Sequence, residues 1–275
     1  MKKYVIIIVR VILKRKELYG GDMKGIVELF KVTTRLPVVE FSSVSDEKLG
    51  KSMKFYPFVG IILGIIMYSS FNLLSMKIDS QILLTIFNVV LYIVLTGAIQ
   101  LNGLSNTFGN IFRYRSKQKM LDGMKEGKNG TNGVLALIIY FFLNVFLLSE
   151  VQENFNTTVG TLILLYPVIG RLNVVVSCIT STTAKSCGTI KHYVSNTTIL
   201  GVVFSFLITI GYTFLVIRHF ELSETLLMSV PITVIFSYLF SKLINKKIGG
   251  ATEDTLGATV ELSQIIFLFL AYFII

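Results

Sequence analysis

The sequence predicts an all-α integral membrane protein, a polytopic bundle of about seven transmembrane helices. Of its 275 residues, 53% are hydrophobic and the mean hydropathy is +0.71. Charged residues make up only 15%, against roughly 25% in soluble domains. The net charge of +10 comes from Lys and Arg lying mainly between apolar runs. This pattern indicates membrane topology rather than binding of nucleic acid, which we do not expect as a partner.

Residues 1–54 are predicted to be a basic, amphipathic segment on the cytoplasmic side, followed by a transmembrane bundle over 55–275. The segment holds twelve Lys or Arg against six Asp or Glu. Its first residues, MKKYVIIIVRVILKRK, favour a helix lying on the lipid bilayer, since Arg10 interrupts the apolar run. No small-residue cleavage site follows, so we do not expect a cleaved signal peptide.

The apolar runs have the length of membrane spans. Residues 55–76 carry no charge and match the roughly 20 residues a spanning helix needs. Gly60 and Gly64 either give this helix a small face for close packing or occur there by chance. Residues 80–112 stay uncharged beyond the length of one span, so we expect that helix to end near 95–100. Five further spans are expected at 133–148, 159–180, 198–217, 225–243 and 255–275.

Basic residues are distributed unequally between alternate loops. The loops at 113–128, 185–192 and 242–254 carry six, two and three Lys or Arg. Those at 77–80, 150–157 and 218–224 carry one, none and one. The positive-inside rule therefore predicts a cytoplasmic N-terminus for a multi-pass protein of the cell membrane.

The stretch 95–133 is the centre of the predicted site. It passes from an apolar run through LNGLSNTFGN into a basic loop. Backbone rich in glycine and amides is tolerated at membrane depth where protein or a water-filled cavity satisfies it, so we do not expect it to face lipid. With the loop at 185 and residues 246–257, it predicts a site for a phosphorylated ligand on the cytoplasmic face.

Two ionisable residues fall inside predicted spans. Arg171 and Glu261 are expected to point into the bundle, where they either pair or line a cavity, because a charge facing lipid is costly. A buried ion pair without chemistry is the alternative. Cys178 and Cys187 predict neither a disulfide nor a zinc site.

Several separated motifs, in a fixed order, resemble one family. They are TRLP (34–37), FYPFVGIILG (55–64), LTGAIQLNGLSNT (95–107), the segment 120–133, the pair 170–171, and GGATEDTLGATVEL (249–262). From residue 23 to its last residue, the chain resembles the cobalamin synthases, integral-membrane adenosylcobinamide-GDP ribazoletransferases.

The resemblance implies a reaction. A hydroxyl of α-ribazole, or of its 5′-phosphate, attacks the phosphate attached to cobinamide in adenosylcobinamide-GDP, and GMP leaves. This is a late step of cobalamin biosynthesis, and Mg²⁺ is the expected cofactor. A homo-oligomer or a membrane complex is left open.

The resemblance also implies roles for residues. The expected catalytic residues are Asp254, Glu261, Asn102 and Asn106. The expected Mg²⁺ ligands are Asp254, Glu126 and Glu261. The residues expected to bind substrate or phosphate are Gly103, Thr107, Lys125, Lys128, Arg171 and Lys185.

The chain departs from the family at its most recognisable motif. Where members carry HLDGLADTxDG this chain has QLNGLSNTFGN, so Gln100 replaces His, and Asn102, Asn106 and Gly109 replace three Asp. An Asn can offer a carbonyl oxygen to a metal, but it cannot act as a base. The alternative is therefore an inactive member that binds corrinoid or nucleotide or scaffolds a membrane complex. A transporter and another head-group transferase are further alternatives.

Overall fold

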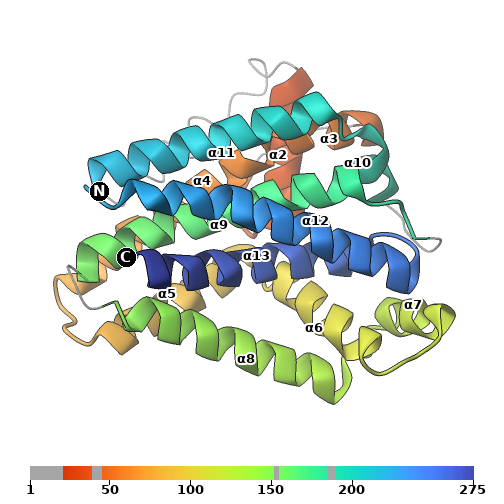
Figure 1. Cartoon of the computed structure of the whole chain (residues 1–275), viewed down its shortest axis with the longest axis horizontal. Coiled ribbons are helices and arrows are strands. Elements are labelled where there is room, and N and C mark those ends of the chain that lie inside the picture. The colour runs from red at the N-terminus through yellow and green to blue at the C-terminus, as the bar shows by residue number, and fades with distance from the viewer. Residues whose placement is uncertain (1–20, 39–44, 152–154, 185–189) are drawn as a thin grey trace.

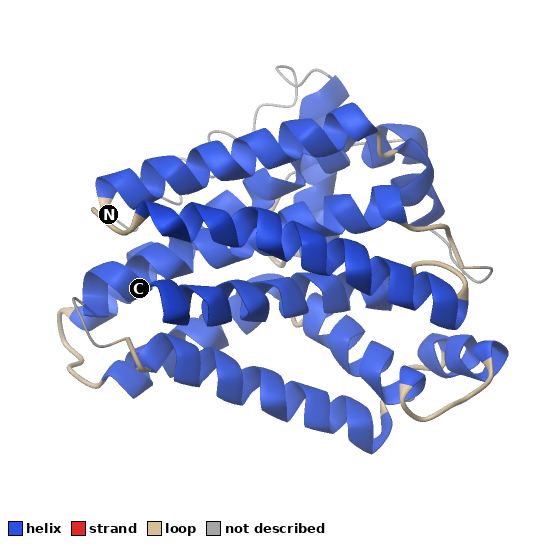
Figure 2. Ribbon diagram, in the orientation of Figure 1, coloured by secondary structure: helices blue, strands red, loops and turns tan. Residues whose placement is uncertain are grey.

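A computed structural model describes residues 21–38, 45–151, 155–184 and 190–275. Within these ranges the secondary structure is helical apart from one isolated β-bridge, Thr183 with Ala251 (Figures 1 and 2). The first elements are α2 (Gly21–Thr33), α3 (Asp46–Ser52), η2 (Met53–Phe55), α4 (Tyr56–Ser75), α5 (Gln81–Thr96), α6 (Ile99–Ile111) and α7 (Lys117–Lys125). Then come α8 (Gly130–Ser149), α9 (Phe155–Thr180), α10 (Ile190–Asn196), α11 (Ile199–His219), η3 (Glu224–Met228), α12 (Ser229–Ile248) and α13 (Glu253–Ile274).

The long helices confirm the prediction of a polytopic bundle. Among the described residues, six helices are long and apolar enough to cross a membrane. The pair α5 and α6 makes a seventh candidate, bent by 93°. The N-terminal amphipathic helix predicted over the first residues lies outside the described part of the chain, and the orientation of the bundle stays a prediction.

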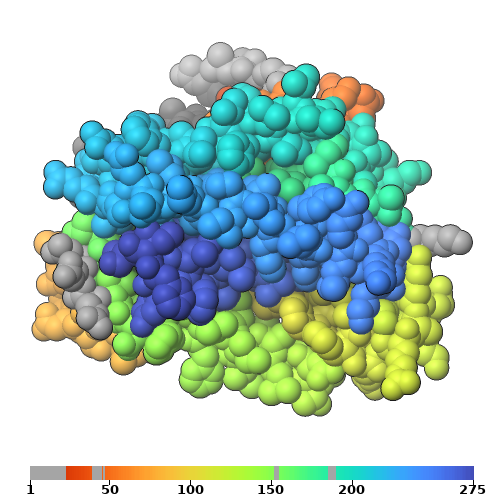
Figure 3. Space-filling view, viewed as in Figure 1, coloured from red at the N-terminus to blue at the C-terminus, as the bar shows by residue number. Residues whose placement is uncertain are grey.

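Helix α9 is the central helix of the bundle. Its residues from Thr158 to Cys178 are all buried, and α11 and α12 lie across the front of the molecule in Figures 1 and 3. The predicted small face of α4 packs on it, because a Cβ on Gly64 would lie only 2.6 Å from the carbonyl oxygen of Leu164. The glycines thus let the α4 backbone approach α9 closely.

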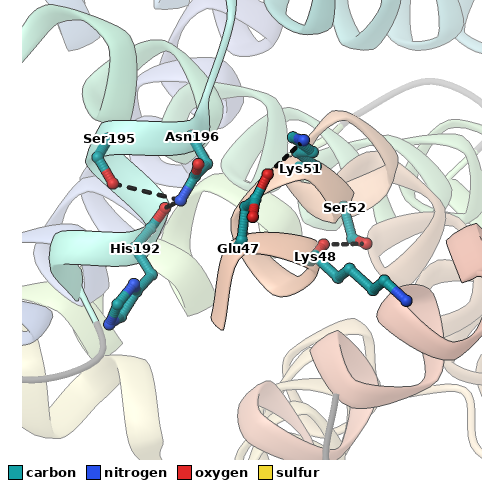
Figure 4. A network of polar contacts seen from close by, with 7 residues as sticks. All are labelled: Glu47, Lys48, Lys51, Ser52, His192, Ser195 and Asn196. Atoms are coloured by element: carbon teal, nitrogen blue, oxygen red, sulfur yellow. Dashed lines mark hydrogen bonds and ion pairs between the residues drawn. The ribbon is translucent and has the colours of Figure 1, made fainter. Parts of the chain in front are cut away.

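The segment before α4 packs into the bundle. Leu29 of α2 and Leu49 of α3 belong to one buried cluster with Val59 of α4 and Ile190 of α10. Helices α3 and α10 meet at Gly50, where a Cβ would overlap the backbone of α10 (Figure 4). This contact fixes α10 beside the N-terminal helices.

Asn196 and Ser52 help to hold the helices on each side of this contact. The Asn196 amide donates hydrogen bonds to the His192 carbonyl at 3.0 Å and to the Ser195 hydroxyl at 3.3 Å. On α3 the Ser52 hydroxyl donates to the Lys48 carbonyl at 2.8 Å. Both polar side chains therefore bond within their own helix and leave Gly50 as the point of close approach.

The chain turns sharply between α5 and α6. Helix α5 ends at Thr96, inside the expected range, and Gly97 and Ala98 follow with φ of 62° and 55°. The N-terminal segment secures this elbow, since the Arg35 amide donates to the Leu95 carbonyl at 2.7 Å. The TRLP motif (34–37), called the clasp below, therefore holds the turn at Gly97 and Ala98, called the elbow, in place.

Helix α6 then carries the glycine- and amide-rich motif. Nothing in that sequence predicts a second helix, yet LNGLSNTFGN is helical throughout. Most of its side chains are buried, as expected for a segment that does not face lipid. The helix satisfies its own backbone groups, and the glycines serve contacts with neighbouring helices.

Gly109 shows how closely α6 is enclosed. A Cβ at this position would overlap the Asn129 carbonyl, whereas a Cβ on Gly211 of α11 meets nothing within 4 Å. We therefore expect Gly109→Ala to destabilise the protein by about 1–3 kcal/mol through overpacking. Gly211→Ala, the matched control, should be neutral or stabilise by up to about 1 kcal/mol. Thermal unfolding in detergent measures both, and equal unfolding temperatures would contradict the contact.

Candidate active site

The loop between α12 and α13 is built from residues with structural tasks. Gly249 ends α12 with φ of 79°, a conformation that favours glycine. At Gly250 the backbone passes so close to Ala184 that a Cβ would overlap it. The Ala251 amide donates to the Thr182 carbonyl at 2.7 Å and its carbonyl accepts from the Ala184 amide at 3.2 Å. The loop is therefore held against the end of α9.

The next residues cap α13. The Thr252 hydroxyl accepts from the Thr255 amide at 3.2 Å, and the Thr255 hydroxyl accepts from the Thr252 amide at 2.8 Å. This capping box leaves Glu253 and Asp254 in the first turn, where the helix dipole favours negative charge. The glycines and threonines of the motif thus shape the loop, and its carboxylates remain for chemistry.

Helix α6 crosses the start of α13 at a pair of glycines. A Cβ on Gly103 would lie 2.7 Å from the Asp254 carbonyl and 3.1 Å from the Gly257 Cα. This approach brings the Asn106 amide nitrogen to 3.2 Å from Asp254 Oδ1, to which it donates a hydrogen bond. The Asn106–Asp254 pair is the centre of the candidate site.

Several polar side chains along α6 have a buried atom without a hydrogen-bond partner. Within the described residues, five such chains have an oxygen that makes no hydrogen bond; they are Gln100, Ser105, Asn106, Thr107 and Asn110. An unpaired buried polar atom costs roughly 1–3 kcal/mol. These atoms face different neighbours, since Ser105 Oγ lies beside Gly133 of α8 and Asn110 Oδ1 beside Gly123 of α7. The unpaired Oδ1 of Asn106, whose amide nitrogen bonds Asp254, is the one that indicates a ligand, an ion or water at this site.

Two further predicted site residues, Asn102 and Gly103, lie on α6, as does Gly109, which stands where the family carries Asp. Asn102 is exposed one turn before Asn106, which places both on the side of the helix that can meet a ligand. Gly103 serves the packing of α6 on α13. Gly109, where the family carries Asp, is closed by the Asn129 backbone, so no gap is left there for a side chain.

The predicted phosphate-binding lysines are scattered. Lys125 is exposed at the end of α7, and Lys185 lies outside the described residues. Lys128 pairs with Glu126, whose carboxylate raises the pKa of that lysine. Lys117 was not among the predicted residues, and its ammonium lies over Gly249 in the loop that carries Asp254. The sequence offered no signal that separates Lys117 from the other basic residues of 113–128.

Arg171 and Glu261 are fully buried in the bundle, as expected, but they do not pair directly. The hydroxyl of Tyr92 lies between them, donating to Glu261 Oε1 at 3.0 Å and accepting from Arg171 Nη1 at 3.3 Å. Gln264 Nε2 donates to the same hydroxyl at 3.0 Å. Neither Arg171 nor Glu261 belongs to the lining of the five most prominent cavities in the described part of the chain. The four side chains form an internal polar network.

The three carboxylates predicted to bind metal do not come together. In the described part of the chain, no three His, Cys, Asp or Glu side chains cluster so that they could hold a metal ion. Glu261 lies two turns beyond Asp254 in the bundle interior, and Glu126 is engaged by Lys128. The potential metal ligands that do meet are the side chains of Asp254 and Asn106. The Oδ1 atom of Asn106 is buried without a hydrogen-bond partner. A carboxylate and an amide oxygen suit Mg²⁺, which keeps several waters and binds substrate phosphates.

The buried network predicts a stability effect. Replacing Glu261 by Leu removes the acceptor of Tyr92 and the charge that faces Arg171, so we expect a loss of about 3–5 kcal/mol. The matched control is Glu224→Gln, which breaks an exposed pair with Arg218 at 3.2 Å and should cost at most about 1 kcal/mol. Thermal unfolding in detergent compares them. Equal unfolding temperatures would show that the network contributes nothing.

Known proteins resemble this chain along nearly its whole length. An adenosylcobinamide-GDP ribazoletransferase of Fusobacterium nucleatum is 39% identical over 269 residues, covering 90% of this chain and 96% of the relative. The enzyme of the same name from Thermoanaerobacter pseudethanolicus is 32% identical over 245 residues, covering 89% and 95%. That from Clostridium acetobutylicum is 32% identical over 250 residues, covering 90% and 96%. No solved structure matches.

The family comparison covers both halves of the candidate site. The model of the family described as cobalamin-5-phosphate synthase matches residues 25–272, which include the clasp, the elbow, α6 and the start of α13. With relatives of one name aligned over nine-tenths of the chain, the resemblance found in the motifs is confirmed. The chain belongs to the cobalamin-5-phosphate synthase family.

Proposed function

We propose that the protein is an active transferase that joins α-ribazole, or its 5′-phosphate, to adenosylcobinamide-GDP. The observation that carries this is the Asn106–Asp254 pair, held at 3.2 Å where two family motifs cross. A carboxylate kept in position by a capped helix and a glycine contact supports a catalytic site. The names of the relatives supply the substrates.

The reaction is a transfer of a phosphoryl-linked group. A hydroxyl of the nucleoside or of its phosphate attacks the phosphorus attached to cobinamide, the bond from that phosphorus to the GMP oxygen breaks, and the hydroxyl proton is released. Such reactions depend mainly on positioning and charge neutralisation. Asp254 is placed to accept the proton, and Asn106 fixes the orientation of its carboxylate.

Charge on the pyrophosphate has to be balanced. We propose that Asp254 and the Asn106 amide oxygen hold Mg²⁺, which when bound neutralises the phosphate oxygens. Lys117 of α7 is the basic residue whose side chain reaches the loop between α12 and α13, where its ammonium lies beside Gly249. Its ammonium offers a point charge to phosphate.

We also propose that this end of the bundle faces the cytoplasm and that the membrane is the cell membrane. The support is the distribution of Lys and Arg, since 113–128 alone carries six. The site then meets water-soluble substrates from the side of the membrane that carries most of the basic loops.

The direct test is transfer by the purified, lipid-reconstituted protein. With adenosylcobinamide-GDP, α-ribazole and Mg²⁺ we expect equal release of GMP and formation of the joined product, both lost on chelation. The inactive alternative rests on the replacement of the family aspartates by Asn102, Asn106 and Gly109. Binding of both substrates without any GMP release would support that alternative.

A further inference from the structure

A cavity of about 240 Å³ lies between the N-terminal segment and the start of α13. Apolar side chains form most of its wall, among them Leu29, Met53, Val174 and Val260. Sites for drug-sized ligands are larger, about 300–1,000 Å³. The cavity can therefore enclose a bicyclic ring, but not a whole corrinoid or a whole nucleotide.

Two buried polar atoms at this cavity have no partner among the described residues. They are Oε1 of Gln100 and the hydroxyl of Tyr193, on side chains that are 3% and 9% exposed. The other end of the Gln100 amide donates to the Thr33 carbonyl at 3.1 Å, which fixes its orientation. An acceptor and a hydroxyl left unpaired in an apolar cavity indicate a ligand with a few matching groups.

The charge of the lining limits the ligand further. Glu253 is the charged residue that lines the cavity, and neither Lys nor Arg lines it within the described residues. A phosphate is therefore disfavoured inside. Guanine carries several donors and acceptors along its edge, more than the two unpaired atoms could match. Glu253 could accept from two of its donors, so guanine binding is an outcome that the test has to separate. A dimethylbenzimidazole ring carries two methyl groups and, once joined to ribose, one free ring nitrogen.

The cavity and the candidate active site share the first two turns of α13. Glu253 and Gly257 line the cavity, while Asp254, next in sequence to Glu253, holds the Asn106 contact. A nucleoside with its base in the cavity can thus extend its ribose past Glu253 toward Asp254. This places the attacking hydroxyl on the side of the proposed chemistry.

We propose that this cavity binds the benzimidazole base of the ribazole substrate. The Tyr193 hydroxyl donates to the free ring nitrogen, and a ribose hydroxyl donates to Gln100 Oε1. This assignment rests on the proposed function, because it takes the nucleoside from that reaction. It adds that the N-terminal helix α2, through Leu29 and Val32, forms part of the substrate site.

The first test closes the cavity from its exposed wall. Val32 lines it and is 40% exposed, so Val32→Trp fills it without disturbing the core. Met23 lies on the same helix, is 43% exposed and lies outside the lining, so Met23→Trp is the matched control. Calorimetric titration of the reconstituted full chain with α-ribazole should show binding weakened at least about tenfold in Val32→Trp only.

The second test removes one polar atom. Because the Tyr193 hydroxyl is buried and has no partner among the described residues, Tyr193→Phe should leave the unfolding temperature unchanged or raise it. It should weaken α-ribazole binding about three- to tenfold, the worth of one hydrogen bond. An analogue with indole in place of benzimidazole, which lacks the ring nitrogen, should bind equally to both proteins.

The outcomes separate the two proposals. Transfer by the native protein with unchanged ribazole binding in Val32→Trp would overturn the cavity assignment and leave the proposed function intact. Weaker binding of adenosylcobinamide-GDP, with ribazole binding unaffected, would overturn it as well. A third outcome is that the native protein binds ribazole but transfers nothing, while Val32→Trp no longer binds ribazole. That result would support the cavity assignment and refute the proposed function.

Discussion

Asp254→Asn is expected to lower transfer by about 10²–10⁴-fold, the usual contribution of a positioned acid or base. The amide keeps the size of the side chain and can still bond Asn106, but it can neither accept a proton nor balance a metal charge. Transfer is measured as GMP release at saturating substrates, alongside thermal unfolding. Stability should fall by no more than about 1 kcal/mol, the worth of a charge at a helix N-terminus.

Asp122→Asn is the matched control for this change. Asp122 is an exposed carboxylate on α7, where it accepts a hydrogen bond from Gln118 at 2.8 Å. Its replacement should leave the rate unchanged. A native rate in Asp254→Asn would show that the carboxylate has no role in the reaction and would remove the Asn106–Asp254 pair from the catalytic site.

Asn106→Asp is expected to make stability depend strongly on Mg²⁺. The substitution replaces a hydrogen bond to Asp254 with two carboxylates side by side, so without metal the protein should unfold at a lower temperature. With Mg²⁺ at about 100 times its dissociation constant, binding should raise the free energy of unfolding by about 2.7 kcal/mol. Adding Asn102→Asp should raise the Mg²⁺ affinity further.

The measurement is the unfolding temperature with Mg²⁺ and with a chelator, in the native protein and in each variant. Asn132→Asp, at an exposed position in the first turn of α8, is the control for nonspecific effects of an added carboxylate. A variant whose unfolding temperature responds to Mg²⁺ no more than the control would show that the metal is not bound between α6 and α13.

The spans were predictable because the bilayer imposes a length on apolar runs. Helices α8 and α9 begin three or four residues before the expected positions, and α5 ends within the expected range. The helical state of α6 was not predictable in the same way. Its glycines disfavour a helix in isolation, and only the contacts of Gly103 with α13 and Gly109 with Asn129 explain why they occur there.

The site was predictable in part. The motif that holds Asp254 and the motif that holds Asn106 could both be identified, but their contact joins residues 148 apart in sequence. Glu261 and Glu126 do not cluster with Asp254 in the described part of the chain, and helical periodicity alone does not show which neighbour faces each turn. Gln100 and Tyr193 could not be paired by spacing, because they come from helices brought together only by tertiary packing.

The Tyr92 hydroxyl between Arg171 and Glu261 bears on how the protein enters the membrane. Arg171 is translated 79 residues after Tyr92 and ninety residues before Glu261. A span carrying an arginine is costly to insert alone. When α9 leaves the ribosome, α5 already offers a hydroxyl to the guanidinium, and Pro167 of α9 itself offers a carbonyl at 3.3 Å. The order of synthesis thus supplies neutral partners to Arg171 before its counter-charge is made.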